Sequence, residues 1–395
     1  MRILSVTQTY APFAEFGGPP AKVLAIAEHL ATRGHEVTVL TADWGVRKHS
    51  RSTPVEASPY GPRAVNGGVE TFYFSTKLRY RTATWNPSAR RFCRDQLRRY
   101  DVAHIYGLYD LLGPAVTSAC RRARLPYVVE PIGMYVPIVR RLWVKRLYHA
   151  LLGSRMIAGA QAVIATSKQE ARELAGAGVA AGRIVQRRNG IEAPATFPPR
   201  GTFRSKLNLP CDAKVVLFLG RIAEKKSPGL LLDAFAHLKE GEQDKQTHLV
   251  FAGPDDGGLG RGLRQRARLL GLSERVHIVG PLYDADKWGA FRDAEVFVLP
   301  SQNENFGNAA AEAVAAGTPA IITENCGIAE ILDKGAALIV PHSRTALTDA
   351  LRRVLHDEGL RAGMKAAQEE AARRLGWDAP VIEMERLYET FLRQA

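Results

Sequence analysis

The chain has 395 residues, 46% of them hydrophobic, and a formal net charge of +14 at neutral pH. This length is too great for one comfortable core, so two domains are expected. No apolar run approaches the ~20 residues that span a bilayer, and the opening MRILSVTQTYAPF reads as a first strand and not as a signal peptide. The four cysteines are scattered with no pair at metal-ligand spacing, which favours reduced thiols in a cytoplasmic protein.

The positive charge lies almost entirely in the first half. Residues 1–196 hold 28 Lys and Arg against 13 Asp and Glu, and the remaining residues are nearly neutral. The basic clusters are Arg79 and Arg81; Arg90, Arg91, Arg94, Arg98 and Arg99; Arg121, Arg122 and Arg124; and Arg140, Arg141, Lys145 and Arg146. Such a field attracts lipid headgroups, lipid-linked phosphates or nucleic acid. The plain alternative is a set of solvated arginine faces in a basic proteome.

Apolar strand patterns alternate with helical periodicity through the first half. The expected strands are Ile3–Thr7, Val37–Leu40, Val69–Phe74, Val102–Tyr106, Tyr127–Val129, Ala162–Ala165 and Ile184–Val185. The expected helices are Lys22–Arg33, Pro87–Arg99, Leu111–Ala123, Pro137–Leu152 and Lys168–Ala177. Residues 43–68 read as one long loop. Alternation of this kind predicts a parallel sheet with helices on both faces.

A proline-rich segment, residues 192–210, predicts a linker, after which the alternation restarts. The expected strands are Lys214–Leu219, His248–Ala252, Val276–Val279, Val296–Leu299, one from Ala320, and Ala337–Val340. The expected helices are Pro228–Lys239, Gly262–Leu270, Asp286–Arg292, Arg344–His356, Leu360–Arg374 and Asp378–Arg393, besides one after residue 307. We therefore predict two doubly wound domains, 1–196 and 197–375, and a final helix, 376–395. Ligands of such sheets bind at the carboxyl ends of the strands, so a cleft between the domains is the expected site.

Two carboxylates flank the start of a small-residue helix in the second half. Glu304 lies in the loop after strand Val296–Leu299, and Glu312 lies within the alanine-rich helix that follows. A helix N-terminus favours an anion such as a diphosphate, and carboxylates accept hydrogen bonds from hydroxyls. A nucleotide-sugar has both kinds of group, although a solvated Glu is the commoner case.

Two cations follow strand Lys214–Leu219. Gly220 permits a tight turn, and Arg221 and Lys226 then offer a planar fork and a point charge to a diphosphate. Surface basic residues in an ordinary loop are the alternative.

These features resemble the retaining glycosyltransferases of the GT-B fold, family 4. The resemblance implies that Arg221 and Lys226 clamp the donor diphosphate, that Glu304 contacts the donor hexose and that Glu312 contacts the nucleotide ribose. It extends to a Gly-Gly pair, Gly17-Gly18, which in the family lies beside the donor phosphates and the acceptor. The chain departs from the family after Lys226, where the family usually has Gly and this chain has Ser227. The remaining residues that it assigns to the donor are Gly17, Gly18, Gly220, Gly253, Pro281, Leu282, Asn305, Phe306, Gly307 and Asn308.

The acceptor side departs from the family. Many members have a His or an Arg where Ile132 stands, and an Ile side chain neither donates a hydrogen bond nor exchanges a proton. The acceptor-side candidates are His104, Glu130, Gly133 and Met134. A lone His in a strand is more often a satisfied core residue.

Two further patterns bear on metals and membranes. Asp284 and Asp286 resemble an Asp-x-Asp metal site, but Asp286 is expected as the N-cap of helix Asp286–Arg292, so no metal or other cofactor is expected. The helix around 140–152 carries Trp143, Val144, Leu147 and Leu151 on one side, which suits either an interfacial basic helix or a core-packed one. Its basic residues, mostly on other sides, are Arg140, Arg141, Lys145, Arg146 and His149.

We therefore expect a retaining, metal-independent glycosyltransferase that moves a hexose-type sugar from a UDP- or GDP-linked donor. The expected acceptor is a saccharide or a lipid-linked molecule in cell-surface polysaccharide or glycolipid biosynthesis. The expected location is cytoplasmic, with a peripheral contact between the basic first domain and an anionic membrane, and with no nucleic-acid partner. The alternatives are another GT-B enzyme, such as an NDP-sugar epimerase or a phosphorylase, and a non-enzymatic protein that binds anionic lipid or nucleic acid. Donor base, sugar, acceptor and oligomeric state are not readable.

Overall fold

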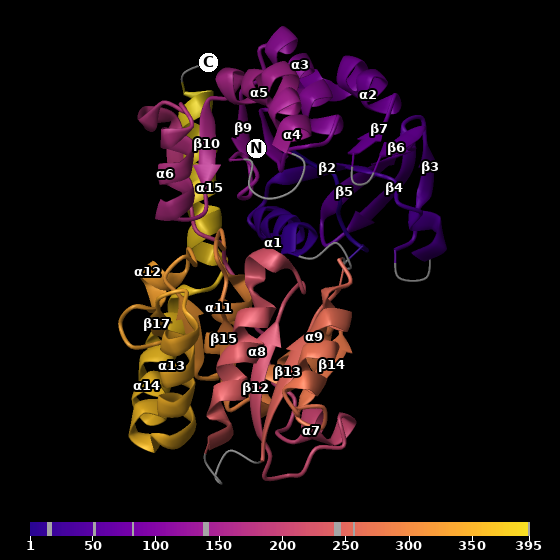
Figure 1. Ribbon diagram of the computed structural model, residues 1–395. Coiled ribbons are helices and arrows are strands. Elements are labelled where there is room, and N and C mark those ends of the chain that lie inside the picture. The colour runs from indigo at the N-terminus through magenta and orange to yellow at the C-terminus, as the bar shows by residue number, and fades with distance from the viewer. Residues whose placement is uncertain are drawn as a thin grey trace. The chain divides into compact units, whose positions relative to one another are not determined.

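The computed structural model describes residues 1–13, 18–49, 53–80, 83–136, 142–240, 246–255 and 257–393 (Figure 1). The chain forms two compact α/β units. Unit 1 comprises Met1–Gly190 and Trp377–Ala395, and unit 2 comprises Ile191–Gly376. Unit 1 thus contains both the first and the last helix of the chain.

Unit 1 is built on a nine-stranded sheet. Its strands are β1 (Arg2–Thr7), β2 (Glu36–Ala42), β3 (Glu56–Ser58), β4 (Gly61–Asn66), β5 (Val69–Phe74), β8 (Val102–Tyr106), β9 (Tyr127–Glu130), β10 (Ala162–Ala165) and β11 (Ile184–Gln186). Their order is β11-β10-β9-β8-β1-β2-β5-β4-β3. The pairs from β11 to β5 are parallel, and the β5–β4 and β4–β3 pairs are antiparallel. The expected parallel sheet is confirmed, with an antiparallel extension at one edge.

Helices cover both faces of this sheet. They are α1 (Gly18–Thr32), α2 (Ser88–Gln96), α3 (Leu112–Ala123), α4 (Leu142–Tyr148), α5 (Ser154–Gly159), α6 (Lys168–Gly176) and α15 (Asp378–Leu392). On one face, Phe92 of α2, Val116 of α3 and Met156 near the start of α5 share a core. On the other face, Ile26 of α1 packs in the same core as Tyr388 of α15.

The prediction of one long loop over 43–68 was wrong. This stretch contains a short 3-10 turn, Val46–His49, and the strands β3 and β4. A second hairpin follows, β6 (Leu78–Tyr80) with β7 (Ala83–Trp85). Short, half-exposed strands carry little apolar periodicity, so the alternation that identified the buried strands could not find them.

Unit 2 has a six-stranded, wholly parallel sheet in the order β14-β13-β12-β15-β16-β17. Its strands are β12 (Lys214–Leu219), β13 (Thr247–Ala252), β14 (Val276–Gly280), β15 (Val296–Leu299), β16 (Ala320–Thr323) and β17 (Leu338–Val340). Its helices are α7 (Thr202–Lys206), α8 (Pro228–Ala236), α9 (Leu259–Leu269), α10 (Asp284–Asp293), α11 (Asn308–Ala315), α12 (Ala329–Leu332), α13 (Arg344–His356) and α14 (Glu358–Arg374). The strands are near-continuous apolar runs, as expected of strands that are buried on both faces.

Several boundaries in unit 2 differ from the predictions. The expected linker, 192–210, contains α7, whose Phe203 is buried in the core of the unit. Helix α10 begins at Asp284 with Tyr283 as its N-cap, so the expectation that Asp286 is the N-cap was wrong. Asp286 instead forms an ion pair with Lys206 of α7.

None of the helices in the described ranges is both long enough and apolar enough to cross a bilayer.

Candidate functional site

The donor-side candidates gather where the strands of the unit 2 sheet end. Gly220 follows β12, and Gly253 follows β13 with φ +146°. A Cβ at Gly253 would lie 2.0 Å from the carbonyl oxygen of Gly220, so only glycine fits between the two loops. The loops after β12 and β13 therefore pack directly against each other.

Lys226 folds back over Gly220. A Cβ at Gly220 would lie 3.3 Å from Nζ of Lys226, so the missing side chain provides the space that this ammonium group occupies. From there Nζ lies 2.9 Å from Oε2 of Glu304, and both side chains are about four-fifths buried. Arg221 is exposed on the same loop. The structure thus brings Lys226 and Glu304 together, as a shared site requires.

Backbone hydrogen bonds fix the loop that carries Glu304. The N–H of Gln302 donates to the carbonyl oxygen of Lys225 at 2.9 Å. The N–H of Glu304 donates to the carbonyl of Asn325, and the N–H of Gly327 donates back to the carbonyl of Glu304, each at 2.9 Å. Three successive loops are therefore joined edge to edge, which holds the Glu304 carboxylate in place.

The Glu304 carboxyl lies in an electropositive setting. Burial raises the pKa of Glu304, but the charges of Lys226, Lys225 and Arg221 outweigh burial and lower it below the ordinary value. Within the described part of the chain, Oε2 has the ion pair with Lys226 but no hydrogen bond of regular geometry. This group is therefore an ionised carboxylate that can still accept a hydrogen bond from a ligand hydroxyl.

Helix α11 starts next to this carboxylate. Its N-cap is Gly307 in a left-handed conformation, φ +106°, and this glycine offers no side chain to cap the first turn. Phe306 is buried in the core of unit 2, so its side chain anchors the loop and leaves only its backbone for a ligand. Asn305 and Asn308 are half-buried on either side of this turn.

Glu312 has a partner that the sequence did not reveal. Nζ of Lys287, on α10, lies 2.8 Å from Oε1 of Glu312. Helix α10 follows Pro281 and Leu282, which lie just after β14. This ion pair therefore joins α10, the helix that follows β14, to α11. No short sequence pattern could have announced it, because the partners lie 25 positions apart on different helices.

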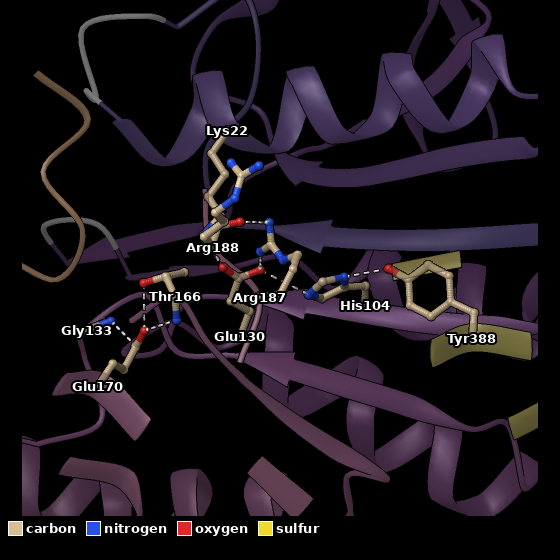
Figure 2. Close-up of polar contacts among 9 residues, drawn as sticks. All are labelled: Lys22, His104, Glu130, Gly133, Thr166, Glu170, Arg187, Arg188 and Tyr388. Atoms are coloured by element: carbon tan, nitrogen blue, oxygen red, sulfur yellow. Dashed lines mark hydrogen bonds and ion pairs between the residues drawn. The ribbon is translucent and has the colours of Figure 1, made fainter. Parts of the chain in front are cut away.

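The acceptor-side candidates His104 and Glu130 lie inside a closed ionic network in unit 1 (Figure 2). The Glu130 carboxylate pairs with Lys22 of α1 and with Arg187, which follows β11. His104 lies 3.4 Å from Glu130 through Nε2, and its Nδ1 lies 2.7 Å from the Tyr388 hydroxyl of α15. All five side chains are fully buried. As the structure stands, Glu130 and His104 hold α1, the sheet and α15 together and present no surface to a ligand.

Opposing forces set the charges within this network. Burial raises the pKa of Glu130, but Arg187 and Lys22 more than offset burial and hold it well below the usual range. Burial lowers the pKa of Lys22 to about 8 and that of His104 to about 4. At neutral pH the network is therefore two cations on one carboxylate, with a neutral histidine.

Gly133 and Met134 lie in the turn that follows Glu130. Ile132 and Gly133 both have left-handed backbones, φ +56° and +67°, and a β-branched residue there is an outlier. The buried carboxylate of Glu170 accepts the N–H of Gly133 at 2.6 Å and also the N–H and hydroxyl of Thr166 (Figure 2). The buried carboxylate of Glu170 thus holds a strained turn at the carboxyl end of β9.

The Gly-Gly pair that was expected beside the donor phosphates is only partly described. Gly17 lies outside the described residues, and Gly18 is the first residue of α1. Over the described ranges, no three His, Cys, Asp or Glu side chains gather closely enough to hold a metal ion.

Comparison with known proteins covers both units. Residues 17–190 match the family described as glycosyl transferase 4-like domain, and residues 199–371 match glycosyl transferases group 1. The D-inositol 3-phosphate glycosyltransferase of Kineococcus radiotolerans is 33% identical over 402 residues, which cover 92% of this chain and 88% of that one. With several other proteins of the same name, the alignment spans only about half of each chain.

Solved structures give the fold. The structure of Anabaena Alr3699/HepE in complex with UDP and glucose covers 98% of this chain and 99% of its own, with TM-score 0.76 and 18% identity. That of WaaG, a glycosyltransferase involved in lipopolysaccharide biosynthesis, covers 96% and 99%, with TM-score 0.67 and 19% identity.

The chain belongs to the group 1, or family 4, glycosyltransferases and has the GT-B fold. It is a transferase enzyme, so the alternative of a non-enzymatic binding protein is set aside.

Proposed function

We propose that this enzyme transfers a hexose-type sugar from a UDP- or GDP-linked donor, with retention of anomeric configuration. The observation that carries the proposal is the Lys226–Glu304 ion pair, which lies beside the start of α11 at the carboxyl edge of the unit 2 sheet. One end of this site suits an anion and the other suits hydroxyl groups. A nucleotide-sugar has a diphosphate between two polyols, which is the matching ligand.

The donor would be held by groups of opposite character. Arg221, Lys226 and the N–H groups that begin α11 would take the diphosphate. Glu304 would accept hydroxyls of the hexose, and Glu312 those of the ribose. The backbone of Pro281 and Leu282 would meet the base, which explains why base identity leaves no side-chain signature in the sequence.

Retention would follow if the acceptor attacks from the face that the diphosphate leaves. An oxygen of the departing diphosphate would then take the acceptor proton. The protein would supply orientation and would stabilise the charge on the leaving group, for which Arg221 and Lys226 are fixed cations. This route needs no protein base and no metal ion.

For the acceptor we propose a saccharide or a lipid-linked molecule of cell-surface assembly, met at an anionic membrane by the basic unit 1. WaaG is a glycosyltransferase involved in lipopolysaccharide biosynthesis, and the Kineococcus radiotolerans relative is named for D-inositol 3-phosphate. Acceptors of both kinds carry negative charge, which suits a positively charged unit.

The first test is thermal unfolding with UDP, GDP, ADP and dTDP in turn, each in excess EDTA. A nucleotide at ~100 times its dissociation constant should add ~2.7 kcal/mol to the stability of the folded protein. We expect a shift with UDP or GDP, and the same shift without EDTA. The Lys226→Ala variant should lose the shift, and the Lys225→Ala variant should keep it.

No shift with any nucleotide would overturn the donor site, and a shift that EDTA abolishes would overturn the metal-free route. Donor turnover that needs only inorganic phosphate, or no acceptor at all, would point to a phosphorylase or an epimerase instead.

A further inference from the structure

The segment from α4 to α5 in unit 1, residues 142–159, has two different faces. Its inner face is apolar and packed, with Met156 and Ile157 buried in the core beside α3. Lys145 also turns inward, with Nζ 5.6 Å from the ring centre of Tyr109. The exposed positions recur every three or four residues and form what we call the outer stripe. They are Trp143, Arg146, Leu147, Ala150, Leu151, Ser154, Arg155 and Ala158.

The outer stripe exposes three large apolar side chains to solvent. Trp143 is 72% exposed, Leu147 51% and Leu151 54%. Trp143 and Leu147 lie four residues apart on α4, which puts them on one side of it. Leu151 follows four residues later in the π-helical turn His149–Gly153. A solvated helix face normally carries charged and polar side chains, and single exposed leucines are common, but three large apolar residues in a row are not. The alternative of a core-packed helix therefore accounts only for the inner face.

The sequence around the outer stripe is strongly basic. Between Asp110 and Glu170 the sequence has a single acidic residue, Glu130, and that carboxylate is fully buried. Arg121, at the end of α3, donates from Nη1 to the carbonyl oxygen of Arg155 at 2.9 Å, so the basic end of α3 lies against α5. Figure 1 shows α3, α4 and α5 together on one side of the unit 1 sheet. Arg121, Arg122 and Arg124 thus extend the positive surface of Arg146 and Arg155.

We propose that the outer stripe is a docking surface for an anionic lipid membrane. Trp143, Leu147 and Leu151 enter the boundary between headgroups and acyl chains, and Arg146 and Arg155 meet the lipid phosphates. An indole suits this boundary because it is apolar with one polar N–H, and arginine can bury its stem while its charge stays at the phosphate. The arginines of α3 add long-range attraction.

The positive charge of the outer stripe favours an anionic lipid membrane over a second copy of this chain as the partner. A second copy of the same stripe would set Arg146 and Arg155 against like charges. The inference takes its purpose from the proposed lipid-linked acceptor, but the binding itself requires neither donor nor transfer.

The test is co-sedimentation of the full-length protein with phosphatidylcholine vesicles, with and without phosphatidylglycerol. We expect binding only to the anionic vesicles, weakened by salt. The triple variant Trp143→Ser, Leu147→Ser, Leu151→Ser should bind at least about tenfold more weakly, since partition follows buried apolar area. The matched control is Leu269→Ser in α9 of unit 2, a helix leucine that is 82% exposed and should leave binding unchanged.

A second measurement locates the contact. Lipids brominated near the headgroup should quench part of the protein fluorescence in anionic vesicles, and Trp143→Phe should remove that part. Equal binding of the triple variant, quenching that survives Trp143→Phe, or a variant that only changes the oligomeric state would overturn the proposal.

The nucleotide-dependent stability shift separates this inference from the proposed function. If nucleotides still shift the stability but the protein binds no vesicles, the docking surface is rejected and the donor site is kept. If the protein binds vesicles but no nucleotide shifts its stability, the donor site is rejected and the docking surface is kept.

Discussion

Glu130 and Glu304 begin from the same pattern and end in opposite roles. Each carboxylate lies at the carboxyl end of a buried parallel strand or in the loop beyond it, and each pairs with a lysine. Glu130 also has Arg187 and its side chain is fully buried, whereas the Glu304 side chain is 17% exposed and its Oε2 has no hydrogen bond of regular geometry within the described residues. The number of partners and the access to solvent, not the residue type, separate a structural carboxylate from one that can meet a ligand.

The largest effect is expected at the closed carboxylate. Replacing Glu130 with Gln leaves Lys22 and Arg187 buried without their counter-charge, and breaking a buried ion pair costs about 3–5 kcal/mol. Denaturant unfolding would measure it. The control Glu370→Gln breaks an exposed pairing with Arg373 and Arg374 that solvent screens, so it should change stability far less. Equal, small losses in both variants would contradict the contrast drawn here.

At the open carboxylate the effect should fall on turnover and not on folding. Lys226→Ala removes a cation from the leaving diphosphate and should lower the rate of transfer at least ~100-fold, the scale of losing one charge-stabilising donor. Initial rates with the donor that the nucleotide screen identifies would measure this. Lys225→Ala is the neighbouring control. Full activity of the Lys226 variant would remove this residue from the site.

Acidification should weaken unit 1 through His104. Burial lowers its folded-state pKa to about 4 from 6.5, so the unfolded chain takes up this proton at a higher pH than the folded chain. Stability is therefore lost as pH falls from about 6.5 to about 4, by on the order of 3 kcal/mol. Unfolding free energies measured across this range should show a shallower slope in His104→Gln. Asp110, whose pKa burial raises to about 6, acts in the opposite direction but is common to both proteins.

The smallest effect is expected for Tyr388→Phe, which removes the hydroxyl that His104 contacts and keeps the ring in its core. The loss of one hydrogen bond should cost about 1 kcal/mol in thermal or denaturant unfolding. If the cost instead approached that of Glu130→Gln, the hydroxyl would be part of the charge balance and not an added contact.

The sequence predicted the parts of this molecule that depend on neighbours along the chain. The predicted limits of strands such as Val102–Tyr106 and Val296–Leu299 agree with the structure, because these segments are mostly apolar. Gly220 with Lys226, and Gly307 with Glu304, were found because each set is confined to one loop. These local patterns also carried the resemblance that the family comparison confirmed.

The unpredicted parts join distant positions. Glu130 meets Lys22 across 108 positions, and His104 meets Tyr388 across 284, so no local pattern distinguishes these residues from others of their type. The sequence likewise does not show that Glu312 pairs with Lys287, which lies 25 positions away. The same limit explains why Glu130 and His104 were chosen as acceptor-side candidates: the sequence shows a polar residue in or beside a strand but not whether it is enclosed.

The return of the last helix to unit 1 has a consequence for synthesis on the ribosome. Residues 1–190 are made first, yet one face of their sheet is covered in part by Val381, Met384 and Tyr388 of α15. All of unit 2 is translated before that helix emerges. The half of the protein that is made first therefore completes its core last, because the apolar side chains that α15 covers stay uncovered until that helix is made.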